Sequence, residues 1–200
     1  RIGARHGLTL DTERYEAARL AAIAELQLHP ELVHDTELWV QFTESIVVGM
    51  GGDPVLSRSC AVELVREWER HENFFLYDDT LPTLAELRRH GLRIGLVSNG
   101  QRDLDEFARH HSLDVDVCVG SLRHGHVKPH RSIFEAALTA LETRPEDAAM
   151  VGDSFADDIA GARALGMRAI LLDRDGLHVD EPDRIDTLLA LPAALGLTPS

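Results

Sequence analysis

The sequence predicts an α/β protein, in which a parallel sheet with helices on its faces follows a small bundle of helices. Three observations predict this fold. Residues 1–75 repeat apolar side chains at helical spacing. From residue 80 onward, short apolar runs of strand length alternate with amphipathic segments, as expected for parallel strands joined by right-handed helical crossovers. Residues 148–167 give the clearest unit: a buried strand, a sharp turn at Gly152 and Asp153, and a helix closed by Gly166.

The first 75 residues are expected to form three or four short helices in an antiparallel bundle. Asp11 and Thr12 supply a capping start for the first helix, and His29-Pro30 ends it. The second helix ends near Gly51-Gly52, and the third covers residues 57–71. The large aromatic side chains of this region are expected in the bundle core rather than at a substrate: Trp39, Phe42 and Trp68.

The remainder of the chain is expected to alternate helices and strands. The predicted helices cover 81–90, 103–110 and 130–141, and the predicted strands cover 92–97, 115–120, 148–151 and 167–172. The segment 170–176 is expected to be the last strand with its exit turn. The tail, 185–195, is expected to be a final helix with a kink at Pro192.

Composition excludes some classes of partner. With 34 acidic and 20 basic residues the net charge is −14, which argues against nucleic acid or an anionic membrane surface. No apolar run is long enough to span a membrane. Only Cys60 and Cys118 are present, without a CxxC pair, so a reducing cytoplasmic location is expected. The sequence gives no indication of an oligomeric state.

Three carboxylates gather at the predicted carboxyl end of the strand 148–151. Asp153 ends the strand, and Asp157 and Asp158 fall in the first turn of the helix that follows. Ligands in open α/β sheets bind at this end of the strands. Three close carboxylates repel one another unless a cation lies between them, and hard oxygen ligands suit Mg²⁺. The alternative is that Ser154 caps the helix while the acids favour its N-terminus, but this accounts less well for Asp153.

Two further polar features stand near predicted strand ends. Ser98 and Asn99 follow the strand 92–97, where a hydroxyl, an amide and backbone N–H groups can grip a phosphate or a carboxylate. Lys128 lies in a loop before the helix that starts near Pro129. Taken singly, the first is also common turn chemistry and the second is an ordinary solvated charge.

In order and spacing, the segments of the second half resemble those of the haloacid dehalogenase-like hydrolases, in particular the phosphatase-type branch with a helical cap. The matching segments are Leu96-Val97-Ser98-Asn99, Val127-Lys128-Pro129, Val151-Gly152-Asp153-Ser154 with Asp158, Gly161-Ala162 and Gly166-Met167. The resemblance implies that residues 1–75 are the cap domain and residues 76–200 a Rossmann-like core. It also implies Mg²⁺-dependent hydrolysis of a small-molecule phosphate ester through an aspartyl-phosphate.

The resemblance implies a role for each site residue. Ser98 would bind the phosphate with Asn99 beside it, and Lys128 would be the catalytic group that neutralises the nucleophile and phosphate. Asp153 would bind Mg²⁺. Asp158, or with less support Asp157, would be a further ligand or an acid behind the ligands. His130 stands where the family more often has an acid, and is interpreted as a surface change of little consequence.

The family's nucleophile lies in an Asp-x-Asp-x-Thr motif that ends the first strand, ahead of the cap, and no such motif precedes the helices here. Asp78-Asp79 has the wrong spacing, and Asp114-Val115-Asp116 begins a strand instead of ending one. Asp173-Arg174-Asp175 ends a strand but lacks the Thr and would require a permuted fold. Because the chain opens on Arg1, we expect a fragment lacking that strand, which in the resembling fold lies between the strands ending at Ser98 and Asp153. Little phosphatase activity and reduced stability would follow.

Two other functions compete with the phosphatase. One is the metal-free haloacid dehalogenase chemistry of the same superfamily. Ser98-Asn99-Gly100 resembles that branch, whereas the acidic group at Asp153 and Asp158 does not. The other is a non-catalytic interaction protein that uses its acidic surface or its cap to bind partners.

Overall fold

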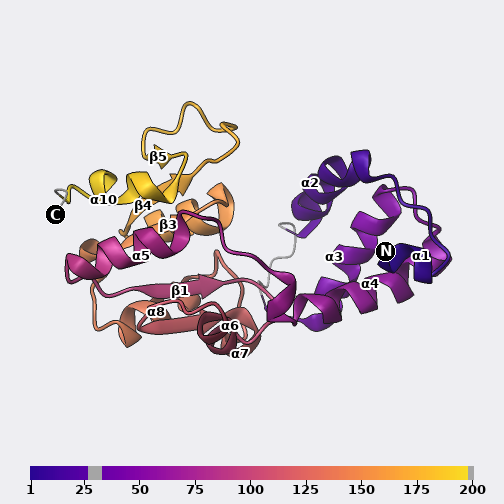
Figure 1. Ribbon diagram of the computed structural model, residues 1–200, viewed down its shortest axis with the longest axis horizontal. Helices are drawn as coiled ribbons and strands as arrows, with labels where there is room; N and C mark the ends of the chain where they lie inside the picture. The colour runs from indigo at the N-terminus through magenta and orange to yellow at the C-terminus, as the bar shows by residue number, and fades with distance from the viewer. Residues whose placement is uncertain (27–32, 198–200) are drawn as a thin grey trace. The chain divides into compact units, whose positions relative to one another are not determined.

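The computed structural model describes residues 1–26 and 33–197, which divide into two compact units, Arg1–Phe74 and Phe75–Ser200. The first unit is helical (Figure 1). Its elements are α1 (Ile2–Arg5), η1 (Thr12–Arg14), α2 (Tyr15–Leu26), α3 (Thr36–Gly49), α4 (Pro54–Trp68) and η2 (His71–Asn73). The end of the first long helix at His29-Pro30, expected from the sequence, lies outside the described residues.

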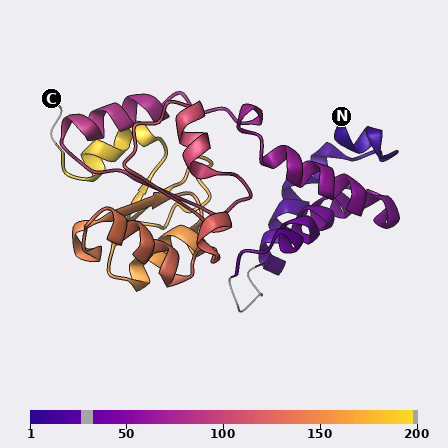
Figure 2. The ribbon, with the colours of Figure 1, turned by 90° about the horizontal axis from the view of Figure 1, so that it is seen from below.

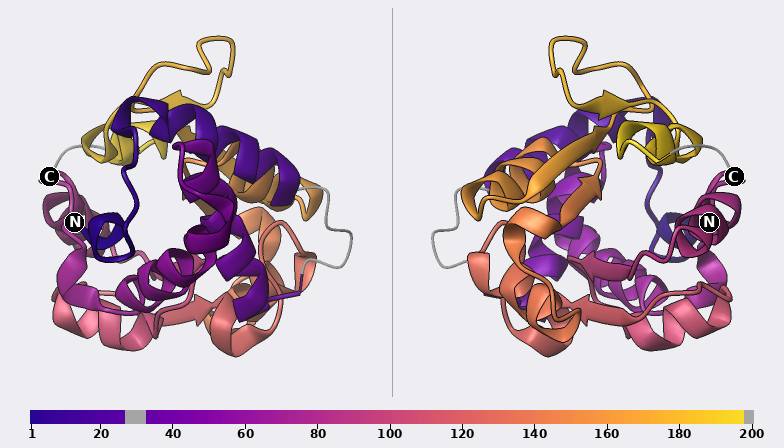
Figure 3. Two further views of the ribbon diagram at one scale, coloured as in Figure 1. Left: turned by 90° about the vertical axis from the view of Figure 1, so that its right-hand side faces the viewer. Right: turned by 90° about the vertical axis from the view of Figure 1, so that its left-hand side faces the viewer.

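Aspartate caps define the two longest helices of this unit. Asp35 accepts a hydrogen bond from the backbone N–H of Glu37 at the start of α3, and Asp53 accepts from Val55 and Leu56 at the start of α4. Helix α3 packs against both α2 and α4 (Figure 3, left). Trp39 and Phe42 of α3 meet edge to face at 5.7 Å and pack against buried apolar residues, as expected for bundle core.

The second unit alternates helices and strands, and all of its strand pairs are parallel within the described residues. The fold class predicted from the sequence is therefore confirmed. Its elements are α5 (Thr80–Arg89), β1 (Gly95–Ser98), α6 (Leu104–His110), β2 (Val117–Gly120), α7 (Ser121–His124), α8 (Arg131–Ala140), η3 (Pro145–Asp147), β3 (Ala149–Gly152), η4 (Phe155–Ala160), α9 (Gly161–Ala164), β4 (Arg168–Leu172), β5 (Arg184–Ile185), η5 (Leu188–Ala190) and α10 (Leu191–Ala194).

Helices cover both faces of the strands, as Figure 2 shows. One face packs on α8, η4 and α9 through a cluster that includes Phe134, Ile159 and Leu171. The other face packs on α5 and α10 through a cluster that includes Leu87 and Ile170. Consecutive residues of β4 thus point to opposite clusters, which is the alternation that a strand buried on both faces requires.

The strands form two hydrogen-bonded groups, β1–β2 and β3–β4–β5. Ser98 at the end of β1 pairs with Gly120, and Gly152 at the end of β3 pairs with Leu171. Within residues 1–26 and 33–197, no backbone ladder joins β1 to β3. The expectation of a further strand between these two stays a prediction.

Three expectations about local structure are wrong. The tail is not one kinked helix, because Arg184 and Ile185 add a strand beside β4 and Pro192 lies in the first turn of a short helix, α10. The strand β4 is therefore followed by another, and the long loop between them extends away from the sheet (Figure 3, right). Beyond Ser154 the first helical residues are π-helical instead of α-helical. Two-residue strands and irregular turns are too short to leave a periodic pattern.

The described helices are all too short or too polar to cross a bilayer.

Candidate active site

Lys128 is held by strand β1 and by the turn that follows strand β3. Its Nζ donates to the main-chain carbonyl of Val97 in β1 at 3.1 Å and to Oδ1 of Asp158 in η4 at 2.5 Å. The side chains of Lys128 and Asp158 are 11% and 3% exposed, so the ion pair is buried. Such a pair persists only when further hydrogen bonds satisfy both partners, and here Val97 supplies one of them.

Lys128 is the only lysine of the chain, and the other 19 basic residues are arginines. The residue type matters because a lysine ammonium is a compact point charge, whereas a guanidinium is a wide planar fork. By its position alone Lys128 is an ordinary loop residue, and the family resemblance is what implies a role for it. Its being the only lysine of the chain is a further signal that the sequence contains.

Asp158 reaches Lys128 because the chain turns sharply at Gly152. The Oδ2 of Asp158 accepts a hydrogen bond from the backbone N–H of Ser154 at 3.1 Å. A Cβ built on Gly152 would lie 2.1 Å from the same oxygen, so only glycine allows the carboxylate to occupy this position. The Oγ of Ser154 accepts from the N–H of Asp157 at 3.2 Å and thereby caps the turn.

The capping explanation and the metal explanation for the acidic residues can both hold. Burial raises the pKa of Asp157, and the negative charges of Asp158 and Asp153 add to this, while the Ser154 hydrogen bond and the Lys128 charge oppose it. A carboxylate whose ionised form is disfavoured by neighbouring carboxylates is one that a cation would stabilise. Asp153 itself is exposed at the end of β3.

The donors fit Mg²⁺ better than a metal that needs a closed protein cage. In the described part of the chain no group of three or more metal-ligating side chains is drawn together. Mg²⁺ commonly takes one or two carboxylates and keeps several waters, so Asp153 and Asp157 are sufficient donors. Both oxygens of Asp158 are already hydrogen-bonded, to Lys128 and to Ser154, which favours a place for it behind the ligands. All three metal assignments stay predictions.

Ser98 and Asn99 lie beside Lys128 but differ in how they are used. The Oγ of Ser98 makes one long contact, 3.5 Å to the carbonyl of Asn99. The side chain of Asn99 forms two hydrogen bonds with the backbone of Lys128: its Nδ2 donates to the carbonyl at 3.0 Å, and its Oδ1 accepts from the N–H at 2.7 Å. The structure therefore brings Ser98, Asn99, Lys128 and Asp158 together.

Ser121 also lies at this end of the strands, although it is not among the residues predicted from the sequence. It is fully buried at the start of α7, directly after β2, and its Oγ accepts a hydrogen bond from the N–H of Gly100 at 3.0 Å. The hydroxyl thus ties the loop after β1 to the chain that leaves β2. A serine that directly follows a predicted strand, as Ser98 also does, was the available signal.

His130 is not the surface change that the sequence suggested. It is half-buried and caps α8, because its Nδ1 accepts from the N–H of Ser132 at 3.3 Å and contacts the Ser132 hydroxyl at 2.8 Å. The Nε2 of His124 also contacts that hydroxyl at 2.8 Å, and the ring of His126 stacks on His130 at 4.1 Å. The imidazole of His130 therefore caps α8 in the way that the carboxylates of Asp35 and Asp53 cap α3 and α4.

The other acidic pairs are occupied by structural roles. The carboxylate of Asp173 accepts from the N–H groups of Leu177 and His178 at 2.8 and 3.0 Å, and thus folds the loop after β4. Asp79 is bound by Arg174 and Thr187.

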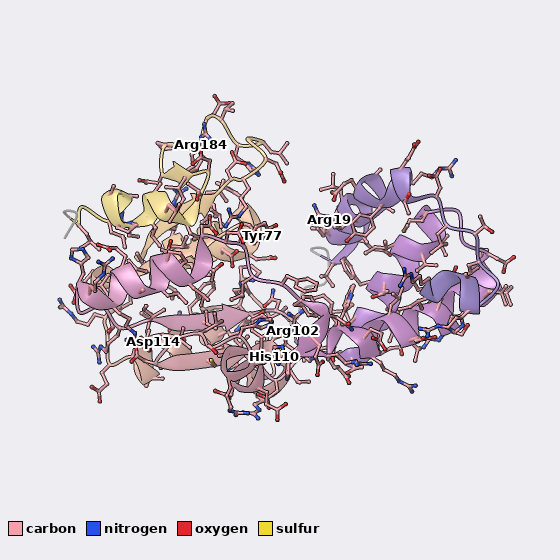
Figure 4. The ribbon with its side chains drawn as sticks, in the orientation of Figure 1. Arg19, Tyr77, Arg102, His110, Asp114 and Arg184 are labelled. Carbon is pink, nitrogen blue, oxygen red and sulfur yellow. The ribbon has the colours of Figure 1, made fainter. Side chains whose placement is uncertain are left out.

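Asp116 binds Arg88 and the N–H of Ile94 at the opposite, amino end of the strands. Figure 4 shows Asp114 well separated from Arg102, which follows the carboxyl end of β1. The pair Asp114 and Asp116 therefore lies away from Lys128, as the sequence predicted for residues that begin a strand.

The comparisons with known proteins agree with this architecture. The haloacid dehalogenase-like hydrolase family matches residues 4–166. "Phosphoserine phosphatase" of Thermus thermophilus is 38% identical over 143 residues, which cover 66% of this chain and 53% of that protein. "Haloacid dehalogenase-like hydrolase domain-containing protein 3" of Danio rerio is 32% identical over 203 residues, covering 94% of this chain and 84% of that protein. The crystal structure of a HAD phosphatase from Thermococcus onnurineus has a TM-score of 0.63 at 26% identity, covering 90% of this chain and 80% of that one.

The chain belongs to the haloacid dehalogenase-like hydrolases. The family inferred from the order and spacing of the matching segments is thereby confirmed. The chain spans about half the length of several of the curated relatives it matches.

Proposed function

We propose that this hydrolase removes phosphate from a small phosphorylated molecule, with Mg²⁺ as cofactor. The observation that carries the proposal is the single lysine of the chain, buried at the carboxyl end of the strands and joined to Asp158. Phosphoryl transfer depends mainly on positioning and on positive charge around crowded oxygens. Relatives named as phosphatases, including the phosphoserine phosphatase of Thermus thermophilus, support the same reaction class.

In this proposal Lys128 neutralises a phosphate oxygen, and Ser98 donates its hydroxyl to another. The Ser98 hydroxyl contacts the Asn99 carbonyl at 3.5 Å, which is long for a hydrogen bond, so little interaction energy is lost when the hydroxyl turns toward a ligand. Mg²⁺ bound by Asp153 and Asp157 would supply further positive charge to the phosphate. Asp158 keeps the ammonium of Lys128 in place. The acidic residues also favour the phosphatase over a metal-free dehalogenase, since displacement of halide at carbon needs no cation.

The reaction also needs a carboxylate nucleophile. In the part of the chain that the structure describes, the one Asp-x-Asp pattern that ends a strand starts at Asp173, and that carboxylate is bound by loop N–H groups. We therefore expect residues 1–200 alone to bind phosphate but to hydrolyse esters slowly or not at all. The helical unit, residues 1–74, is proposed to be the family's cap domain. The free thiols of Cys60 and Cys118 support a location in a reducing cytoplasm.

Titration calorimetry with inorganic phosphate, with and without Mg²⁺, tests the proposal. Wild-type chain is expected to bind phosphate, and more tightly with Mg²⁺ present. Lys128→Met should weaken binding by about tenfold or more, the value of a charge-assisted hydrogen bond. Arg131→Gln is the matched control, because it removes one positive charge three residues away from an exposed pair with Glu135. Its affinity should stay within about twofold of wild type.

Two results would overturn the proposal. Absence of phosphate binding by the folded wild-type chain would favour the non-catalytic interaction protein. Equal loss in Lys128→Met and Arg131→Gln would make the binding non-specific. Hydrolysis of p-nitrophenyl phosphate is measured in parallel. Rapid turnover that is abolished by Asp173→Asn or Asp175→Asn would instead support a permuted site.

A further inference from the structure

Asn99 was expected beside the phosphate, but its side chain is engaged elsewhere. The amide Nδ2 donates to the carbonyl of Lys128 at 3.0 Å, and Oδ1 accepts from the N–H of the same residue at 2.7 Å. These two bonds close a ring between one side chain and one backbone residue, in the manner of paired strands. They use the acceptor of the carboxamide and one of its two N–H donors.

The end of β1 holds Lys128 at two places. The carbonyl of Val97 accepts from the ammonium group, and Asn99, two residues later, binds the backbone of the same lysine. A lysine side chain has four rotatable bonds and loses much rotamer freedom when it is fixed. A fixed backbone reduces the number of positions that the ammonium can take, and so favours the one in which it reaches both Val97 and Asp158.

The two bonds require one donor and one acceptor on the same side chain, which the carboxamide of Asn99 supplies. Aspartate would lose the donor and set an anionic oxygen against the Lys128 carbonyl, and alanine would lose both bonds. Ser98, the neighbouring residue, makes no bond to Lys128 in the described structure and keeps its hydroxyl toward its own strand end. The two residues of the Ser98-Asn99 pair thus divide the work.

We propose that Asn99 is a positioning residue that acts through Lys128 and does not bind phosphate itself. This inference rests on the proposed function for the role of Lys128, but its structural part does not. The two hydrogen bonds from Asn99 fix the Lys128 backbone and thereby keep the ammonium in the buried pair with Asp158. Without these bonds the ammonium is freer to move, and anion binding weakens only to the extent that Lys128 contributes to it.

Chemical modification of Lys128 tests whether Asn99 positions this lysine, and it does so without phosphate. Because the chain has a single lysine, acetylation by acetic anhydride followed by peptide mapping reports one side chain, separate from the N-terminal amine. Asn99→Ala should accelerate acetylation of Lys128 about tenfold, the factor that corresponds to about 1.4 kcal/mol of lost hydrogen bonding. Asn73→Ala is the matched control, since Asn73 is the other asparagine and binds Glu67 in the helical unit.

Far-UV circular dichroism checks that each variant is folded. If Asn99→Ala is unfolded, Asn99→Asp, which keeps the size of the side chain, takes its place and should also accelerate acetylation. Rates for both Asn99 variants within about twofold of wild type and of Asn73→Ala would overturn the inference.

Phosphate affinity then separates positioning from direct binding. Asn99→Ala should weaken binding in the wild-type background but cause no further loss in the Lys128→Ala background. An equal loss in both backgrounds would show that Asn99 contacts phosphate and would overturn the inference. If wild type binds no phosphate, the proposed function fails, while the acetylation rates still decide whether Asn99 positions Lys128.

Discussion

The buried pair of Lys128 and Asp158 gives a quantitative prediction about stability. Nζ and Oδ1 are 2.5 Å apart, and the side chains are 11% and 3% exposed. At an effective dielectric constant of about 20, two unit charges at this distance attract by about 7 kcal/mol. Removal of both charges from water costs several kcal/mol per ion, so the intact pair contributes little net stability. Removal of one partner leaves the other charge buried without compensation.

We therefore expect Lys128→Met and Asp158→Asn each to lower the free energy of unfolding by about 3–5 kcal/mol. The double variant, Lys128→Met with Asp158→Asn, should cost much less than the sum of the two single changes, because it leaves no unpaired charge. Arg131→Gln serves again as the exposed control and should change the free energy of unfolding by less than about 1 kcal/mol.

Urea denaturation measures these changes with two probes. Far-UV circular dichroism follows both units, whereas Trp39 and Trp68, the only tryptophans, report on the helical unit alone. The tryptophan midpoint is expected to move less than the dichroism midpoint in every variant. Single variants that stay within about 1 kcal/mol of wild type, or a double variant that costs the full sum, would refute the reasoning.

Three other changes test the packing and the titrating groups. Gly152→Ala should lower the free energy of unfolding by about 1–3 kcal/mol in thermal melts, because its Cβ would displace the Asp158 carboxylate. Gly100→Ala is the control, since a Cβ there has its nearest neighbour at 4.0 Å. Burial and nearby histidines lower the pKa of His124, so this side chain takes up a proton more readily in the unfolded chain than in the folded one. The melting temperature should therefore fall as the pH drops below 6.5, and His124→Gln should make the melting temperature less dependent on pH. Hydrogen bonds from Arg174 hold the pKa of Asp79 well below its usual value. The stability that this ionised carboxylate contributes above pH 3.8 should therefore be lost as the pH falls further. Asp79→Asn should lower the free energy of unfolding, measured in urea near neutral pH, by about 3–5 kcal/mol.

The sequence predicted the parts of the fold that leave a periodic signal. Helix α8 and strand β4 appear within one residue of their expected ends, because apolar residues recur there at regular spacing and turn residues bound them. Strand β5 has only two residues and pairs through a long loop that Asp173 folds, so no local pattern marks it. The helix predicted for 185–195 is longer than the observed α10 because no local pattern separates it from β5.

The candidate site was predictable as a set of residues but not as a set of contacts. Parallel strands bring their carboxyl ends to one edge, which is why residues after β1 and β3 could be expected to meet. The sequence could not show that Asp158 turns back to Lys128, since this depends on the missing Cβ of Gly152. Nor could it show that the amide of Asn99 faces the Lys128 backbone, because loop conformations place both groups.

Protection of Lys128 by phosphate is the most direct measurement of the central claim, that this lysine faces an anion-binding site next to a metal site. The acetylation rate of Lys128 is compared with no additions, with inorganic phosphate, and with phosphate and Mg²⁺ together. Phosphate is expected to slow acetylation, and Mg²⁺ is expected to strengthen this protection in wild type but not in Asp153→Asn. A rate that is the same under all three conditions in the folded wild-type chain would contradict the central claim.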